Sequence, residues 1–199
     1  MKKLVLLIFF IQVYSAEAQV KKGLKGGLNV ANMSFGNEKE NSRLGFYAGF
    51  AARVGFSKAV FVQPEILYSS KGFRYDTPTA AYKIGEIKLN YLSVPLMFGI
   101  TAPGTKLSFM AGPEFGIMLR ATQWEGTGGR KRTDFNERDI SVNLGIAYKL
   151  FKGLGAELRY SSGTKGISTV TYTDVNGADI GTENIGKNRV VQLGFFVLL

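Results

Sequence analysis

Residues 44–56, LGFYAGFAARVGF, alternate between apolar side chains and small or polar ones at every second position. One face of this segment carries only apolar residues, namely Leu44, Phe46, Ala48, Phe50, Ala52, Val54 and Phe56. The other face carries glycine, alanine, Tyr47 and Arg53. Because successive side chains of a β-strand point to opposite faces, this period of two predicts a strand that is apolar on one side only.

Seven further segments repeat the alternation, so the sequence predicts eight strands in all. They cover residues 24–31, 60–71, 88–100, 107–117, 139–148, 154–161 and 191–199. Pro64, Pro95 and Pro113 fall inside three of these segments. Since proline cannot donate a hydrogen bond to a neighbouring strand, we expect a bulge or a local gap at each of the three positions.

The connectors between the predicted strands alternate in length along the whole chain. Long connectors are predicted at residues 33–43, 72–86, 120–138 and 162–188, and short ones at 57–58, 101–104 and 150–153. An antiparallel up-and-down barrel produces this alternation when all its short turns lie at one end. Asn176-Gly177, a favoured pair for a hairpin turn, is predicted to join two strands that extend beyond the barrel rim.

The interior volume of an eight-stranded barrel decides which strand face points outward. Side chains or one small ligand just fill such an interior, whereas about five large apolar residues per strand, roughly forty in all, would overfill it. The sequence therefore predicts an all-β, eight-stranded antiparallel transmembrane β-barrel of the OmpA/OmpX type, with its apolar face toward lipid. A soluble, secreted lipocalin-like barrel that binds a ligand is the alternative. Aromatic girdles at the membrane interfaces are expected from Tyr148 and Phe151 at one end and from Tyr68, Phe73 and Tyr160 toward the other.

The first 18 residues have the three parts of a secretory signal peptide. Lys2 and Lys3 precede an apolar run at residues 4–11, and Ala16 and Ala18 supply small residues at the cleavage positions. A membrane anchor is the alternative, but it requires about 20 apolar residues. We therefore expect cleavage after Ala18 and export of residues 19–199 as one outer membrane barrel domain. The chain has no other long apolar run, which argues against a helical membrane protein.

Several short motifs resemble the PorT-type outer membrane β-barrel family. They are GGLN at residues 26–29, QPEILYS at 63–69 followed by Lys71-Gly72, YLSVPL at 91–96 and AGP at 111–113. The resemblance spans nearly the whole chain after the signal segment, and it implies a small Gram-negative outer membrane barrel with no specific activity. It also implies an association with protein secretion, because the name-giving member is linked to a dedicated secretion pathway. The final Leu199 departs from the aromatic residue that usually ends such barrels.

Ionisable residues predicted on the inward face are balanced in charge. The carboxylates are Glu65, Glu114, Asp139 and Glu157, and the cations are Lys25, Arg53, Lys71 and Arg159. A charge in a narrow lumen is tolerated only when it is paired, so we expect these side chains to form a polar network that plugs the barrel. The chain has no Cys and no His, and we expect no enzyme and no catalytic, cofactor-binding or metal site. A narrow channel, or a lipid-modifying enzyme that uses a carboxylate pair, is the alternative.

A basic stretch, GTGGRKR at residues 126–132, lies in the third long connector. It lacks the Gly-Lys-Ser/Thr ending of a phosphate-binding loop. Arg130, Lys131 and Arg132 are candidates for contact with anionic outer membrane lipid, including lipopolysaccharide, and a solvated loop is the alternative. Nucleic-acid binding is not expected, because the chain is exported and its positive charge is scattered. Connectors 120–138 and 162–188 are expected to lie outside the cell and to bind a protein partner, which predicts a structural or interaction role.

Overall fold

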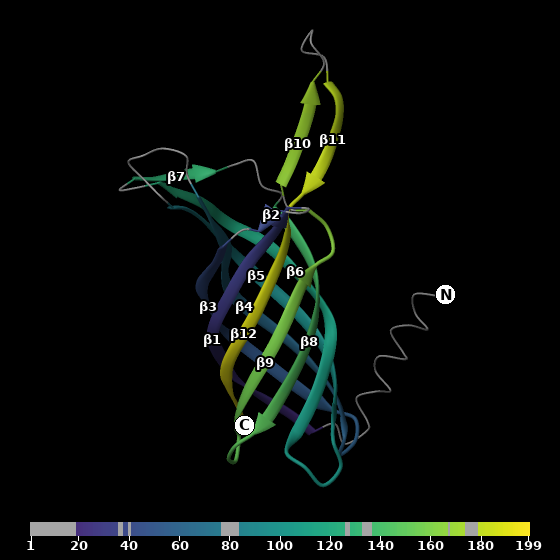
Figure 1. Cartoon of the computed structure of the whole chain (residues 1–199). Coiled ribbons are helices and arrows are strands. Elements are labelled where there is room, and N and C mark those ends of the chain that lie inside the picture. The colour runs from purple at the N-terminus through teal and green to yellow at the C-terminus, as the bar shows by residue number, and fades with distance from the viewer. Residues whose placement is uncertain are drawn as a thin grey trace, which may run out of the picture.

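The computed structural model describes residues 19–35, 38–39, 41–76, 84–125, 128–132, 137–166, 168–173 and 179–199. Eight antiparallel strands form a closed barrel (Figure 1). They are β1 (Gln19–Phe35), β3 (Asn41–Gly55), β4 (Val60–Asp76), β5 (Ile84–Thr101), β6 (Leu107–Glu125), β8 (Arg138–Lys149), β9 (Leu154–Gly163) and β12 (Lys187–Leu198). Pairing of β12 with β1 closes the barrel and confirms the predicted fold. Among the described residues, no helix is long and apolar enough to cross a membrane.

Three short turns lie together at one end of the barrel, as the connector lengths predict. They join β3 to β4, β5 to β6 and β8 to β9. Main-chain hydrogen bonds close them, for example from Ala102 N to Leu107 O at 2.9 Å and from Leu150 N to Leu154 O at 3.0 Å. Gly104 adopts a φ of +72°, which a glycine enters without the steric cost that other residues meet.

Additional strands lie beyond the other end of the barrel. β2 (Glu38–Lys39) pairs with β1, and β7 (Gly128–Arg132) pairs with β6. β10 (Ser168–Thr173) and β11 (Asp179–Ile185) form a separate two-stranded sheet (Figure 1). The two strands predicted in the last long connector are thus confirmed, while the proposed turn at Asn176-Gly177 lies outside the described residues. The signal segment, residues 1–18, also lies outside them.

The barrel strands run further toward the long connectors than the alternation predicts. β4 and β5 stay paired to Asp76 and Ile84, so most of the predicted connector 72–86 is strand. β6 continues to Glu125, where it still pairs with Gly85 of β5. The apolar face ends before these strands do, because a strand needs a lipid-facing apolar side only within the hydrocarbon layer. Backbone pairing continues beyond that point, where apolar and polar side chains no longer alternate regularly along the sequence.

The strand prolines lie at local gaps and not at bulges. The β4–β5 pairing passes from Pro64 opposite Leu96 to Leu67 opposite Ser93, and the register is the same on both sides of the gap. A similar gap without a register change surrounds Pro113 between β5 and β6. The register shifts occur elsewhere, between Ser42 and Tyr47 of β3 and between Asn90 and Tyr91 of β5.

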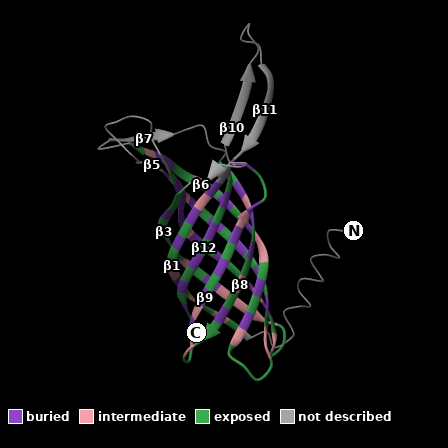
Figure 2. Ribbon diagram, viewed as in Figure 1, coloured by how far each residue is buried: buried purple, intermediate pink, exposed green. Residues whose placement is uncertain are grey.

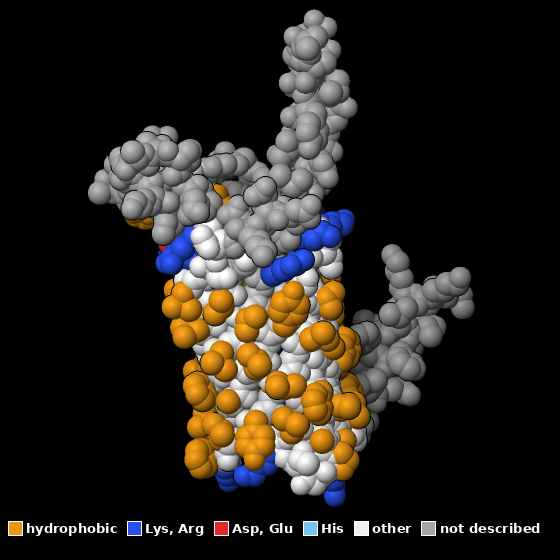
Figure 3. Space-filling model, in the orientation of Figure 1, with side chains coloured by type: hydrophobic (Ala, Val, Ile, Leu, Met, Phe, Trp, Pro, Cys, Tyr) orange, Lys and Arg blue, Asp and Glu red, His pale blue; other side chains and the backbone are white. Residues whose placement is uncertain are grey.

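The apolar strand faces point outward and the small or polar faces point into the barrel. Exposure alternates residue by residue along β12, and large apolar side chains such as Phe50, Leu144 and Phe195 are 67%, 59% and 59% exposed (Figure 2). On the face that Figure 3 shows, hydrophobic side chains cover the wall of the barrel, and Lys and Arg lie at its two ends. This arrangement is the reverse of a soluble barrel, so the lipocalin-like alternative is wrong.

One residue of the expected aromatic girdles is misplaced. Tyr148, Phe151 and Tyr160 are exposed on the outside, and Tyr68 shares their outward strand face. Phe73 instead is buried in the lumen at 4% exposure. Phe73 lies near the end of β4, as a girdle residue would, but odd-numbered residues of this strand point into the barrel.

Candidate functional site

Four of the predicted lumen residues form a buried ion cluster with equal numbers of positive and negative groups. Arg159 of β9 donates from Nη1 to Glu65 Oε2 at 3.0 Å and from Nη2 to Glu65 Oε1 at 2.8 Å. Its Nη2 also lies 2.8 Å from Glu157 Oε1. The Nζ of Lys25 lies 3.0 Å from Glu65 Oε1 and 2.8 Å from Glu157 Oε1. All four side chains are at most 1% exposed, so the pairing offsets the cost of removing these charges from water.

A second cluster, nearer the long connectors, joins three more of the predicted residues. Lys71 Nζ lies 2.9 Å from Glu114 Oε1 and 3.4 Å from Asp139 Oδ2. One ammonium group here faces two carboxylates. Neutral side chains supply further donors: Asn143 Nδ2 donates to Glu114 Oε2 at 2.9 Å, Asn188 Nδ2 to Asp139 Oδ2 at 2.8 Å, and Ser141 Oγ to the same Asp139 oxygen at 3.4 Å. The predicted network is therefore present as two clusters of side chains in the barrel lumen.

Arg53 reaches the first cluster through Gln63, whose Nε2 donates to Glu65 Oε1 at 2.6 Å. The Nε of Arg53 donates to Gln63 Oε1 at 2.8 Å, and its guanidinium lies 4.0 Å from the ring centre of Phe61 and 5.6 Å from that of Phe196. No acidic partner for it is present among the described residues. Arg53 is thus part of the predicted polar network, although its direct partner is a neutral amide and not a carboxylate.

Two apolar clusters in the lumen were missed by the sequence analysis. One lies toward the short turns and comprises Ala51, Phe61, Met97, Met110, Ala147, Phe196 and Leu198. The other lies toward the long connectors and comprises Met33, Phe73, Ile87, Leu89, Tyr91 and Ala121. A signal for the first was present in the final strand, where Phe196 and Leu198 interrupt the polar face.

Inward glycines make room for the aromatic rings of the apolar cluster near the short turns. A Cβ atom on Gly99 would overlap the ring of Phe61, and one on Gly155 would overlap the ring of Phe196. The lumen of an eight-stranded barrel is just wide enough for its side chains, so a bulky residue on one strand requires a small one opposite. The Gly-rich inward faces of the strands thus reflect the packing of this narrow interior.

The ion clusters lie between the two apolar clusters and are shielded from solvent. Lys71 and Asn143 are 0% exposed, and Glu65 and Glu114 are 2% exposed. Each of the four carboxylates is engaged through at least one oxygen by a cation or an amide, while Asp139 Oδ1 and Glu157 Oε2 have no hydrogen-bond partner among the residues that the structure describes. Within the described part of the chain, no group of three or more His, Cys, Asp or Glu side chains could hold a metal ion. The geometry therefore fits a closed structural core.

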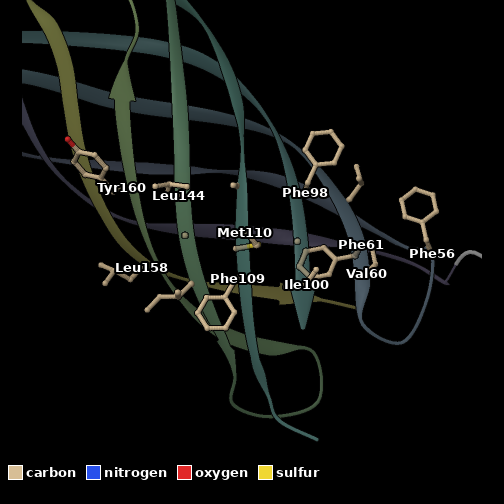
Figure 4. Close-up of a pocket in the computed structure, with 15 residues that line it drawn as sticks. Phe56, Val60, Phe61, Phe98, Ile100, Phe109, Met110, Leu144, Leu158 and Tyr160 are labelled. Carbon is tan, nitrogen blue, oxygen red and sulfur yellow. The ribbon is translucent and has the colours of Figure 1, made fainter. Parts of the chain in front are cut away.

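An apolar depression on the outer wall is a feature of the lipid-facing band. It is lined by side chains of β4, β5, β6, β8 and β9, including Phe98, Phe109 and Leu144 (Figure 4). These three side chains are 46–59% exposed on the outside of the barrel. The depression lies among residues that lipid chains cover in a transmembrane barrel, so it needs no separate ligand.

The predicted basic contact residues lie on an added strand. Arg130, Lys131 and Arg132 belong to β7, whose backbone pairs with β6 from Ala121 to Glu125. Their side chains lie outside the described part of the structure. Connector 120–138 therefore begins with the end of β6 and contains β7, and connector 162–188 contains the β10–β11 sheet.

A closed antiparallel barrel with an apolar exterior and a polar, filled interior is the architecture of small bacterial outer membrane proteins. Residues 12–166 match the sequence profile of the outer membrane protein beta-barrel domain. The chain belongs to this family, and its location is the bacterial outer membrane. The short turns of such barrels face the periplasm and the longer loops face the outside.

Solved structures with the same fold include the attachment invasion locus protein Ail of Yersinia pestis. In complex with the heparin analogue sucrose octasulfate, Ail is 11% identical, with a TM-score of 0.52 over 90% of this chain and 99% of that chain. A second Ail structure is 12% identical, with a TM-score of 0.50 over 90% and 98%. Neisserial surface protein A is 12% identical, with a TM-score of 0.47 over 88% and 96%. At these identities the likeness to the two Ail structures shows the fold alone. Comparison with curated protein sequences finds no match.

Proposed function

We propose that this outer membrane barrel has a structural or interaction role at the cell surface and is neither a channel nor an enzyme. The observation that carries the proposal is the lumen, in which two ion clusters lie between two apolar clusters. Moving an ion through this interior would require breaking buried ion pairs and hydrating apolar layers, both of which cost several kcal/mol. What remains available for function is the surface that the barrel presents beyond the membrane.

The extracellular connectors support binding of a protein partner. The β10–β11 sheet is hydrogen-bonded separately from the barrel sheet, so it can be removed without breaking a barrel strand pair. The decisive experiment replaces residues 168–185 by a short Gly-Ser turn and compares in vivo crosslinking with the unaltered protein. A matched control keeps the length of this segment but substitutes Gly and Ser throughout.

We expect both variants to assemble normally, which heat-dependent gel mobility reports, and to lose the crosslinked partner. A parallel deletion within 126–136 tests the other connector. If neither connector changes any crosslink or surface phenotype while the barrel assembles, the interaction role is wrong.

An association with protein secretion is the finer form of this proposal, and it rests on the PorT-type motifs described above. The test compares the secreted proteins of a strain lacking the chain with those of a strain that carries the 168–185 replacement. Loss of the same secreted proteins in both strains supports a secretion role through this connector. Unchanged secretion in the strain that lacks the chain contradicts it.

Contact with lipopolysaccharide is supported by cations around the outer end of the barrel (Figure 3). Outward-facing, exposed cations at this end are Arg120, Arg138, Lys187 and Arg189. They lie beyond the apolar band, where phosphate groups of the outer leaflet attract basic side chains. We propose that Arg130, Lys131 and Arg132 extend this contact. Glutamine at these three positions is expected to reduce the lipopolysaccharide that copurifies, whereas Lys22→Gln at the opposite end should not; equal retention contradicts the contact.

We further propose that a signal peptidase removes residues 1–18. Small residues at Ala16 and Ala18 and the preceding apolar run support cleavage after Ala18. N-terminal sequencing of the protein from isolated outer membranes should begin at Gln19. A chain that retains residues 1–18 in that membrane would contradict the proposal.

A further inference from the structure

The end of the barrel that carries the short turns contains a cavity of about 700 Å³ inside its mouth. Six of its lining residues are cations, namely Lys21, Arg53, Lys58, Lys106, Lys149 and Lys152. Each of the three short turns contributes one lysine, and the inward faces of β1, β3 and β8 contribute the other three residues. No aspartate or glutamate lines the cavity. Figure 3 shows cationic side chains gathered at this end of the molecule.

The cations of the mouth differ from those of the lumen because the protein leaves them unpaired. Within the part of the chain that the structure describes, the side chains of the five lysines make no ion pair or hydrogen bond. Arg53 uses only Nε, in its bond to Gln63, and its Nη2 has no partner. Glu65 and Glu157 do not line the cavity and are already paired with Lys25 and Arg159. Arg53 reaches Glu65 only through the side-chain amide of Gln63.

Apolar side chains line part of the cavity wall. The apolar cluster near the short turns closes the inner end of the cavity. Phe61, Phe196 and Leu198 line both the cavity and that cluster. A concave site with low-dielectric walls focuses the field of its charges, so six cations in this space attract anions much more strongly than the same cations on an open surface. The hydroxyl groups of Thr101 and Ser108 lie 2.9 Å apart on the wall and add neutral hydrogen-bonding groups.

We propose that this periplasmic mouth is a binding site for a phosphate-bearing ligand. The volume is that of a small-molecule site, and the barrel wall surrounds it, so it suits a compact polyanion and not a folded partner. A planar guanidinium with ammonium groups around it is the donor set that phosphate oxygens require. The phosphate source is either a phospholipid head group of the inner leaflet, which lies at this depth, or a soluble phosphorylated molecule of the periplasm.

Adjacent lysines of β1 provide a matched pair for the test. Lys21 lines the cavity, whereas Lys22 is exposed on the outer face and does not line it. Binding of inorganic tripolyphosphate to the full barrel in uncharged detergent is measured by titration calorimetry, with folding verified by heat-dependent gel mobility. Lys21→Gln is expected to weaken binding about fivefold, while Lys22→Gln changes it less than twofold. Arg53→Gln is expected to weaken it about tenfold, since it removes hydrogen-bond donors from a charged ligand.

Saturable binding that depends on Lys21 and Arg53 but not on Lys22 supports the site. Equal effects of the two lysine variants would show diffuse attraction by the membrane-facing rim and overturn the proposal, as would absence of saturable binding to folded protein. The source is distinguished by competition. Displacement of tripolyphosphate by phosphatidylglycerol but not by phosphatidylcholine supports a lipid head group, whereas displacement only by soluble phosphate esters supports a periplasmic molecule.

Discussion

Replacing Arg159 by Met is expected to destabilise the barrel by about 3–5 kcal/mol, because removal of one member of a buried ion pair leaves its partners uncompensated. The Arg159 side chain is 0% exposed and contacts both Glu65 and Glu157. In the variant, two buried carboxylates would share the single ammonium of Lys25. Methionine keeps much of the volume, so the change acts mainly on charge and hydrogen bonding.

The contacts of Arg159 give a similar magnitude. Its Nη1 and Nη2 make two hydrogen bonds to Glu65, and Nη2 lies within 2.8 Å of Glu157. At about 1.5 kcal/mol for each hydrogen bond to a charged group, the three contacts together account for about 4.5 kcal/mol. This is a large part of the 5–15 kcal/mol by which a typical protein is stable.

Arg53→Met is the matched control, because it removes the same charge from an inward-facing position on another strand of the barrel. It breaks one hydrogen bond, to Gln63, and the contact with the ring of Phe61, so we expect a loss of only about 1–2 kcal/mol. Adding Glu65→Gln to Arg159→Met leaves Lys25 and Glu157 as a one-to-one pair. This double variant should recover more than half of the lost stability.

The assay is equilibrium unfolding by urea in lipid vesicles, followed by the fluorescence of Trp124, the only tryptophan of the chain, and by gel mobility. If Arg159→Met is no more destabilising than Arg53→Met, Arg159 does not compensate the buried carboxylates as described. The same conclusion follows if Glu65→Gln gives no recovery, because the loss would then reflect packing and not an excess of buried negative charge.

Other expected outcomes concern the lumen and the outer wall. In planar bilayers the protein should give no stepwise conductance, since apolar clusters lie on both sides of the ion clusters; discrete steps from the purified barrel would contradict the closed lumen. Gly155→Ala should destabilise by about 1–3 kcal/mol, because the new methyl group overlaps the ring of Phe196, whereas Gly145→Ala meets its nearest atom at an ordinary 3.4 Å and should cost less than about 1 kcal/mol in the same urea assay. Leu144→Arg on the lipid face should cost about 2–4 kcal/mol, and unchanged stability in vesicles would place that face away from lipid.

Most of the barrel could be predicted because its two determinants are local. The alternation of apolar and polar residues in segments such as residues 44–56 shows which side of a strand faces outward. The lengths of the connectors show which end of the barrel carries the short turns. The extents of β4, β5 and β6 beyond the membrane could not be predicted, because their outer parts are held by backbone pairing to a neighbouring strand. Residues that pair outside lipid need no apolar face, so the sequence carries no periodic signal there.

The sequence predicted which ionisable residues lie in the lumen, but not which of them contact one another. Seven of the eight predicted lumen residues occupy the two ion clusters, as parity and the cost of buried charge require. The partner of each one depends on the register and stagger of strands on opposite sides of the barrel, which periodicity does not encode. Arg53 shows the consequence: it shares the inward face with the others, but it lines the cavity at the mouth and reaches Glu65 only through Gln63.

The cations of the ion clusters and the cations of the mouth differ in their partners, which indicates that the first group serves stability and the second serves binding. Lys25, Lys71 and Arg159 are buried and bonded to carboxylates, so their charges serve the closed core. The cations of the mouth have no acidic neighbour on the cavity wall, and their mutual repulsion disfavours the folded state. A stable core does not require such a cluster, whereas binding of an anion would relieve the repulsion. The unpaired cations are therefore better explained by a ligand than by folding, and the Lys21 and Lys22 variants separate these explanations.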